Sequence, residues 1–188
     1  MKQKDLLEFL NVLETLKTSA RHSVTCGGVP ETVAAHSWRL AVMALLVAPQ
    51  IDEIDHDKVI RMCLVHDFGE AVTGDVPSFQ KTEANEKAEA NAVKRLLDRL
   101  SEPQRTELLS LFKEMNALQT REARLYKALD KLEAVIQHNE SDISTWIPLE
   151  YTLNLDYGAE NAAEFPYLHA LRTLMRKETE RKIQQAEE

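Results

Sequence analysis

The sequence has few of the residues that interrupt helices. Among its 188 residues only 5 are glycine and 6 are proline, while leucine, alanine, glutamate and lysine are frequent. The frequent residues favour helices, whereas glycine and proline disfavour them. We therefore expect an all-α helical bundle. A chain of this length can bury one sizeable core, so we expect a single domain over residues 1–188.

Cysteine and long apolar runs are also scarce. Cys26 and Cys63 are the only cysteines and form no Cys-x-x-Cys pair, so no disulfide framework is expected. The first residues lack the basic and then apolar layout of a signal peptide. The longest apolar run, Leu40 to Ala48, is too short to span a bilayer. We expect a soluble, cytoplasmic protein that does not contact a membrane.

Positive charge is in deficit. The formal net charge is -8, and no long basic run occurs. A nucleic-acid polymer is therefore not expected as a partner, because its phosphates need a basic surface. A small anionic ligand remains compatible with this charge, since a metal ion and one or two local cations can outweigh the overall field.

Hydrophobic residues recur at helical spacing along most of the chain. The spacing predicts helices over residues 4–18, 32–48, 57–68, 81–100, 103–117, 121–138 and 165–185, and a short or irregular helix over 146–157. Residues 19–30 are predicted to form a loop and residues 69–78 a turn, and no segment alternates clearly enough to predict a strand. The core of the fold is expected at about residues 20–140, with the helices of residues 143–188 packed on it.

An adjacent histidine and aspartate end one of the apolar runs. On a helix, His66 and Asp67 would both stack over apolar residues of the preceding turn, among them Cys63. A carboxylate that points into a core costs several kcal/mol unless a partner neutralises it. A divalent metal ion would pair with both side chains at once.

Two further polar residues lie on or beside apolar helix faces. His36 shares a face with Val33 and Leu40, and Asp130 lies at the edge of the stripe of its helix. Alone, His36 would be a hydrogen-bonded core histidine and Asp130 a salt-bridged or solvent-facing residue. Together with His66 and Asp67 they form a mixed nitrogen and oxygen set, which suits Mn, Co, Mg, Fe, Zn or Ni.

In this order, His36, the pair His66-Asp67 and Asp130 resemble the H…HD…D signature of the HD-domain metal-dependent phosphohydrolases. The segment His-Asp-Phe-Gly-Glu-Ala-Val-Thr-Gly-Asp-Val-Pro is similar to the subgroup of bacterial 5'-deoxynucleotidases and related small HD hydrolases, and so is the segment from Ala128 to Glu133. The resemblance implies the HD fold and a metal-dependent phosphohydrolase activity. It implies His36, His66, Asp67 and Asp130 as ligands of a divalent ion.

Details of the motif separate the subfamilies. Guanosine tetraphosphate hydrolases carry an acidic pair after the HD, but here Glu70 is followed by Ala71. Cyclic-dinucleotide phosphodiesterases have HD-x-G-K, where this chain has Glu70 in place of the lysine. Dinuclear HD enzymes need further histidines, and the remaining ones here match no such pattern. We therefore expect one metal ion.

Two carboxylates after the HD pair are candidates for catalysis. Glu70 lies about one turn past Asp67, from where it could act as a general acid or base; otherwise it is an ordinary surface glutamate. In the subgroup that the chain resembles, Asp75 corresponds to a carboxylate near the sugar and the attacking water. Asp75 also suits a turn, because it follows a glycine and precedes Val-Pro.

Arg21 and His22 are candidates for binding the substrate. Arg21 precedes His36 by fifteen residues, the spacing at which the bacterial deoxynucleotidases place a phosphate-binding arginine, whose fork suits phosphate. The alternative is an exposed loop arginine. Those enzymes have tryptophan directly after this arginine, where this chain has His22, so sugar selectivity is open. Lys127 and Lys131 beside Asp130 would add charge near a phosphate, or else be solvated.

These observations predict a phosphomonoesterase that hydrolyses a nucleoside 5'-monophosphate, with deoxyribonucleotides as one option. One alternative is a non-hydrolytic HD module that binds a nucleotide and a metal as a regulatory element. Another is an HD phosphodiesterase or pyrophosphohydrolase that acts on another nucleotide. Related HD proteins are commonly homodimers, so a homodimer is expected here.

Overall fold

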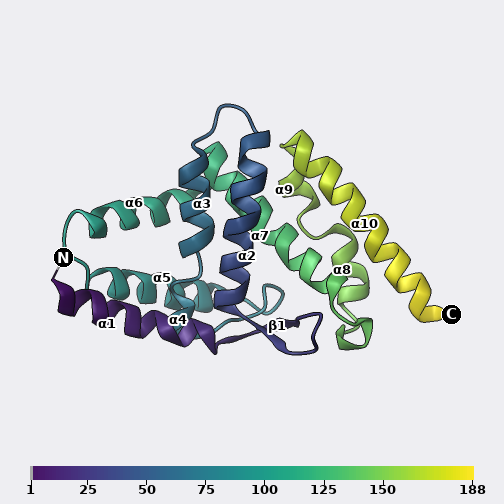
Figure 1. The fold of residues 1–188 in the computed structure, drawn as a ribbon, viewed down its shortest axis with the longest axis horizontal. Coiled ribbons are helices and arrows are strands. Elements are labelled where there is room, and N and C mark those ends of the chain that lie inside the picture. The colour runs from purple at the N-terminus through teal and green to yellow at the C-terminus, as the bar shows by residue number, and fades with distance from the viewer. Residues whose placement is uncertain (1) are drawn as a thin grey trace.

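Helix α7 (Arg121–Glu140) runs through the middle of the molecule (Figure 1) and packs against helices from both halves of the chain. The computed structural model that shows this describes residues 2–188. Apolar side chains at spacings of three and four, including Leu125, Leu129 and Leu132, are fully buried along α7. This spacing places them on one side of a helix, where they form the centre of the core.

Helices make up nearly all of the regular structure. They are α1 (Gln3–Leu13), α2 (Val33–Val47), α3 (His56–Val65), α4 (Glu70–Thr73), α5 (Glu83–Leu97), α6 (Gln104–Ala117), α7, α8 (Glu150–Asp156), α9 (Ala159–Ala163) and α10 (Pro166–Glu187), with 3-10 turns at Glu14–Lys17, Ala48–Gln50 and Ile143–Thr145. The prediction of an all-α bundle is confirmed. None of the helices in residues 2–188 combines the length and the apolar character that crossing a bilayer requires.

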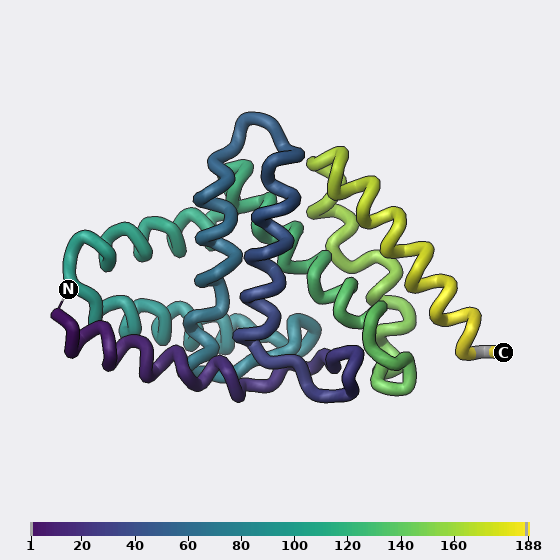
Figure 2. Tube along the Cα trace, viewed as in Figure 1, coloured from purple at the N-terminus to yellow at the C-terminus, as the bar shows by residue number. Residues whose placement is uncertain are grey.

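Helices α2 and α3 lie side by side and pack on α7, as the trace in Figure 2 shows. Each begins at a side-chain cap. Thr32 accepts a hydrogen bond from the Ala35 amide at 3.2 Å, and Asp55 accepts one from the Lys58 amide at 3.0 Å. Such caps satisfy backbone amides that have no partner within the helix. The two caps therefore fix the residue at which each helix begins.

The prediction of a loop over residues 19–30 is wrong in part, because this region forms a small antiparallel hairpin. Strand β1 (Ala20–Val24) pairs with β2 (Pro30–Thr32). The turn contains Gly28, whose φ of 76° favours glycine. A pair this short is held by backbone hydrogen bonds and by packing on α7, so it leaves no alternating pattern in the sequence. The hairpin places Arg21 and His22 on a strand.

Helix α3 ends at Val65, three residues before the predicted end at Phe68. His66 is its C-cap, and Asp67 lies in the turn before α4 begins at Glu70. Gly69 allows this turn to pack on α5, because a Cβ at this position would lie 2.6 Å from Glu89 Cγ and 3.1 Å from the Glu89 carbonyl oxygen. His66 and Asp67 therefore lie at the end of α3 and in the following turn, and not within a continuous helix as the sequence predicts.

Among the C-terminal helices, α10 packs on α7, α8 and α9, and α9 also packs on α7. Helix α9 was not predicted, since five residues are too few to show a period. Gly158 joins α8 to α9 with a φ of 78°, and a Cβ there would lie 3.0 Å from Lys131 Cβ and 3.1 Å from Leu132 Cδ1. This junction therefore needs glycine for its backbone conformation and for its close approach to α7.

We expect Gly158→Ala to lower the free energy of unfolding by about 2 kcal/mol, because alanine adds a left-handed backbone penalty and a steric overlap with α7. Gly28→Ala is the matched control. Gly28 also has a positive φ of 76°, but a Cβ there meets no atom within 4 Å, so only the backbone penalty of about 1 kcal/mol applies. Urea denaturation measures both. Equal losses would contradict the close packing of Gly158.

Candidate metal centre

Two imidazoles face each other where α2 meets the end of α3. The Nε2 atoms of His36 and His66 lie 3.3 Å apart, and both residues are buried. His66 Nδ1 lies 2.9 Å from the carbonyl oxygen of Cys63, which can only accept, so this nitrogen is the donor. His36 Nδ1 is hydrogen-bonded to the carboxylate of Glu133. When each ring is neutral, its Nε2 lone pair therefore points into the shared space.

Two carboxylates complete the cluster. Asp67 Oδ2 lies 3.0 Å from His66 Nε2 and 4.0 Å from His36 Nε2. Asp130 Oδ1 lies 3.3 Å from His36 Nε2 and 3.6 Å from His66 Nε2. A divalent ion that binds its ligands at about 2.0–2.2 Å holds ligand atoms at separations of this size. The predicted convergence of these four side chains is therefore present in the structure.

The electrostatics of the cluster favour a cation. Burial disfavours the charged forms of both partners, but the attraction between His66 and the two carboxylates outweighs it. The pKa of His66 is raised to about 10 and that of Asp67 is lowered to about 2. Facing lone pairs and carboxylates need either a proton or a metal ion between them. The donor set, two nitrogens and two oxygens, fits a borderline or hard divalent ion.

Glu70 lies beside this cluster and is not a surface residue. Its side chain is buried, and its Oε2 has no hydrogen-bond partner among residues 2–188. Carboxylate oxygens of Asp67, Glu70 and Glu89 all lie within 4.8 Å of one another. Burial and the neighbouring carboxylates Asp67 and Asp75 raise the pKa of Glu70 to about 9. Glu70 therefore holds a proton at neutral pH in the metal-free protein.

Arg21 reaches the same region from β1 and is not an exposed arginine. Its side chain is 16% exposed, with Nη1 at 3.3 Å from Glu31 and 3.7 Å from Glu133. The Nε atom lies 4.0 Å from Asp75. Glu31 also accepts a hydrogen bond from Ser23 at 2.8 Å. These carboxylates hold the guanidinium beside the imidazole cluster.

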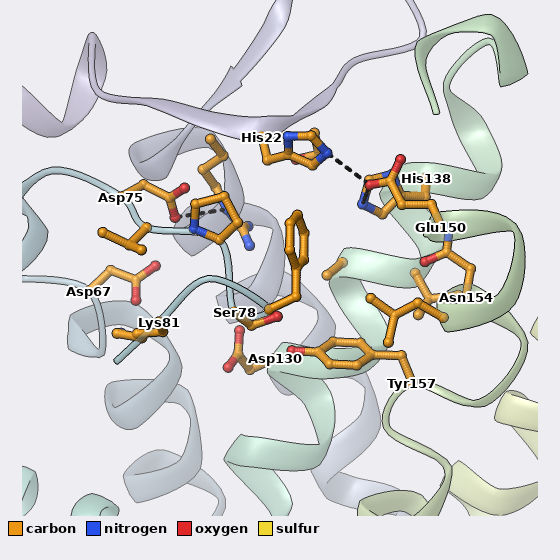
Figure 3. A pocket seen from close by; sticks show the side chains of 18 of the residues that line it. His22, Asp67, Asp75, Ser78, Lys81, Asp130, His138, Glu150, Asn154 and Tyr157 are labelled. Carbon is orange, nitrogen blue, oxygen red and sulfur yellow. Dashed lines mark ion pairs between the residues drawn. The ribbon is translucent and has the colours of Figure 1, made fainter. Parts of the chain in front are cut away.

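A pocket extends from the cluster toward α8 (Figure 3). Its free space, counted together with the open solvent at its mouth, is about 910 Å³. Three cations line it: Arg21, Lys81 and Lys127. Lys127 Nζ lies 2.8 Å from Asp130 Oδ2, whereas Lys131 bonds to Asn161 at 2.8 Å. Of the two lysines considered from the sequence, Lys127 is thus the one at the pocket.

The other predicted binding residues also line this pocket. Asp75 and His22 both do so, and His22 Nε2 lies 3.1 Å from Glu150 Oε1. Four polar residues near the site, which no sequence pattern singled out, are Glu133, Glu150, His138 and Asn154. Glu133 could have been found, because it follows Asp130 by three residues and so shares its helix face. Glu150 and Asn154 left no comparable signal, since their helix is short.

Several known proteins are similar to this chain over most of its length. A model of the HD domain family matches residues 13–170. The human protein named 5'-deoxynucleotidase HDDC2 is 33% identical over 141 residues, which cover 73% of this chain and 68% of the human one. The Dictyostelium discoideum protein of the same name is 36% identical over 144 residues, covering 71% and 76% respectively.

A solved structure has the same fold. The predicted metal-dependent phosphohydrolase from Magnetospirillum magnetotacticum superposes with a TM-score of 0.81 at 30% identity, covering 95% of this chain and 93% of that one. The match to the family model extends over most of the chain and includes the four side chains of the cluster. The chain therefore belongs to the HD domain family.

Proposed function

We infer that the chain is a metal-dependent phosphomonoesterase that cleaves nucleoside 5'-monophosphates into nucleoside and phosphate. The observation that carries this inference is the convergence of two imidazole nitrogens and two carboxylates beside a pocket with three cations. Relatives named 5'-deoxynucleotidase, at 33% and 36% identity, support the same substrate class.

We propose that His36, His66, Asp67 and Asp130 hold one divalent ion, of the group Mn, Co, Mg, Fe, Zn and Ni. When bound, such an ion polarises a phosphoryl oxygen and lowers the pKa of water toward about 7. The hydrogen bonds to Glu133 and to the Cys63 carbonyl fix the tautomers of the two histidines. The imidazoles are therefore oriented before the ion binds.

The other side chains handle charge and protons. Arg21 and Lys127 would neutralise the phosphate oxygens, as a guanidinium fork and an ammonium do in other phosphate sites. Glu70, which carries a proton at neutral pH in the metal-free protein, would give that proton to the leaving oxygen. In the ionised form, which a bound cation favours, it would instead accept a proton from the attacking water. Asp75, near Arg21, would orient the sugar or that water.

A panel of phosphomonoesters tests this function. Phosphate release from ribo- and deoxyribonucleoside 5'-monophosphates is measured with each divalent metal. Turnover that needs a metal supports the proposal. Tight nucleotide binding without phosphate release would identify a non-hydrolytic module instead. Selective cleavage of diesters or of nucleoside di- and triphosphates would identify a phosphodiesterase or pyrophosphohydrolase.

We expect Arg21→Ala to raise KM by about tenfold or more, because a charged hydrogen bond to phosphate contributes about 1.5–3 kcal/mol. Arg39→Ala is a matched control. Arg39 Nε bonds to Glu133 at 2.6 Å, so its loss also removes a cation from that carboxylate, but Arg39 does not line the pocket. Steady-state kinetics at saturating metal compares them. Equal increases in KM would contradict direct phosphate binding by Arg21.

The proposal also covers domain organisation, assembly and location. We propose that residues 1–188 form one HD domain, that the protein is a homodimer and that it is cytoplasmic. Trp38, Leu45 and Leu46 on α2 are exposed by 67%, 56% and 67%, which supports an apolar contact between copies. Light scattering coupled to gel filtration tests the dimer, and a mass near 21.4 kDa would contradict it.

A further inference from the structure

The far end of the pocket contains a second cluster of polar side chains, which the phosphate chemistry does not use. Glu150 on α8 lies between His22 on β1 and His138 on α7 (Figure 3). Both Nε2 atoms approach the same oxygen, Glu150 Oε1, at 3.1 and 3.2 Å. The other carboxylate oxygen accepts a hydrogen bond from the Ile147 amide at 2.8 Å. Glu150 is therefore held in place at the end of the pocket.

The cluster is not arranged as a metal site. Within residues 2–188, the groups of three whose ligand atoms all lie within 4.8 Å of one another do not include His22, His138 and Glu150. The two ring nitrogens thus lie near one carboxylate oxygen without converging on a common point. Desolvation lowers the pKa of His138, so this ring is neutral at pH 7. The cluster is equipped for hydrogen bonding.

One donor and one acceptor in this cluster have no hydrogen-bond partner among the described residues. They are Asn154 Nδ2 and Glu150 Oε1, and the two imidazole nitrogens near Glu150 Oε1 make no contact with hydrogen-bond geometry. Glu150 is 1% exposed and Asn154 is 2% exposed, and both line the pocket. They lie four residues apart on α8 and so share one face of that helix. Leaving such groups unpaired costs about 1–3 kcal/mol each, which a ligand edge would recover.

Aromatic side chains border the same end of the pocket. The rings of Phe79 and His22 meet edge to face, with centroids 5.5 Å apart, and Tyr157 lies beside Asn154 in the pocket wall. Flat apolar surfaces next to a hydrogen-bonding pair are suited to a planar heterocycle. The cations Arg21, Lys81 and Lys127 belong to the same pocket. The pocket thus combines groups suited to a phosphate with groups suited to a nucleobase.

We propose that Glu150 and Asn154 bind the edge of the nucleobase and make the enzyme prefer nucleotides over other phosphomonoesters. The carboxylate accepts from a base N–H, and the amide donates to a ring nitrogen or a carbonyl oxygen. Every common base has such a donor beside an acceptor on its pairing edge. This inference rests on the proposed function, since it names what the same pocket recognises beyond the phosphate.

The test compares kcat/KM for four deoxynucleoside 5'-monophosphates with kcat/KM for 2-deoxyribose 5-phosphate, which has no base. Glu150→Gln and Asn154→Ser are expected to lower the ratio of nucleotide to sugar phosphate by at least about tenfold, since a site built around a hydrogen-bonding group discriminates strongly through it. Glu160→Gln, an exposed glutamate on α9, is the matched control and should leave the ratio unchanged.

The possible results separate the two claims. If both variants keep the wild-type ratio, or lose the two activities in equal proportion, base recognition by α8 is wrong. If the wild-type enzyme prefers the sugar phosphate, the inference also fails, although the phosphomonoesterase function stands. If the wild-type enzyme hydrolyses no phosphomonoester with any metal, the proposed function itself fails. Two variants are used because Glu150 also bonds to the Ile147 amide, and Asn154→Ser leaves that bond intact.

Discussion

Replacing Asp67 by alanine is expected to lower kcat/KM by at least about 10³-fold and to remove measurable metal binding. Asp67 Oδ2 lies 3.0 Å from His66 Nε2 and, with Asp130, supplies the negative charge of the cluster. A bound divalent ion contributes several kcal/mol to transition-state stabilisation, and each 1.4 kcal/mol changes the rate tenfold. Metal binding by calorimetry and phosphate release by the same samples measure both effects.

The thermal stability of the metal-free protein separates loss of binding from loss of folding. A metal at a hundredfold excess over its Kd stabilises the native state by about 2.7 kcal/mol. We expect this stabilisation in the wild-type protein and in Asp52→Ala, an exposed control, and its absence in Asp67→Ala. An Asp67→Ala protein that still gains stability from metal and retains turnover would show that Asp67 is not a ligand.

Glu133→Gln is expected to weaken metal binding by about 10- to 100-fold, the usual effect of losing a carboxylate that orients a ligating histidine. Glu133 is fully buried, accepts the His36 Nδ1 hydrogen bond and faces Arg39 Nε at 2.6 Å. Glutamine keeps the size of the side chain but offers one neutral oxygen in place of the carboxylate. The His36 ring is then less basic and less firmly oriented. Calorimetric titration with metal gives the affinity.

Glu140→Gln is the matched control for this experiment. Glu140 accepts a hydrogen bond from Arg39 Nη1 at 2.5 Å, but its side chain is 51% exposed. It therefore shares the arginine partner of Glu133 without the contact to His36. Unchanged affinity in Glu140→Gln, with a loss in Glu133→Gln, is the expected outcome. Equal losses would mean that the arginine network, and not the contact to His36, sets the affinity.

Helices were predictable because their signal is local. Apolar residues at spacings of three and four mark α2, α5, α6, α7 and α10 to within a few residues of their observed bounds. Thr32 as a helix cap was predictable for the same reason, since the cap contacts an amide three residues away. The end of α3 was not predictable. It depends on the close approach of Gly69 to α5, a contact between segments twenty residues apart.

The residue types at the candidate site were also readable from the chain. Two features identified the site: polar residues on otherwise apolar helix faces, and the family motif. They pointed to His36, His66, Asp67 and Asp130, which the structure brings together. The surroundings were not readable. Burial of Glu70 and the enclosure of Arg21 by carboxylates come from neighbours distant in sequence, and no local pattern records them.

Local periodicity and side-chain chemistry thus establish the helical class, the family and which polar residues lie on apolar faces and need a partner. Each of these depends only on residue identity or on neighbours along the chain. Folding alone establishes that β1, α7 and α8 enclose one pocket, with Glu133 behind a candidate metal centre and Glu150 and Asn154 at the opposite end. The physical reason is that burial, tautomer and pKa depend on atoms from segments that can be more than a hundred residues apart, such as His22 and Glu150. These atoms meet only when the helices pack.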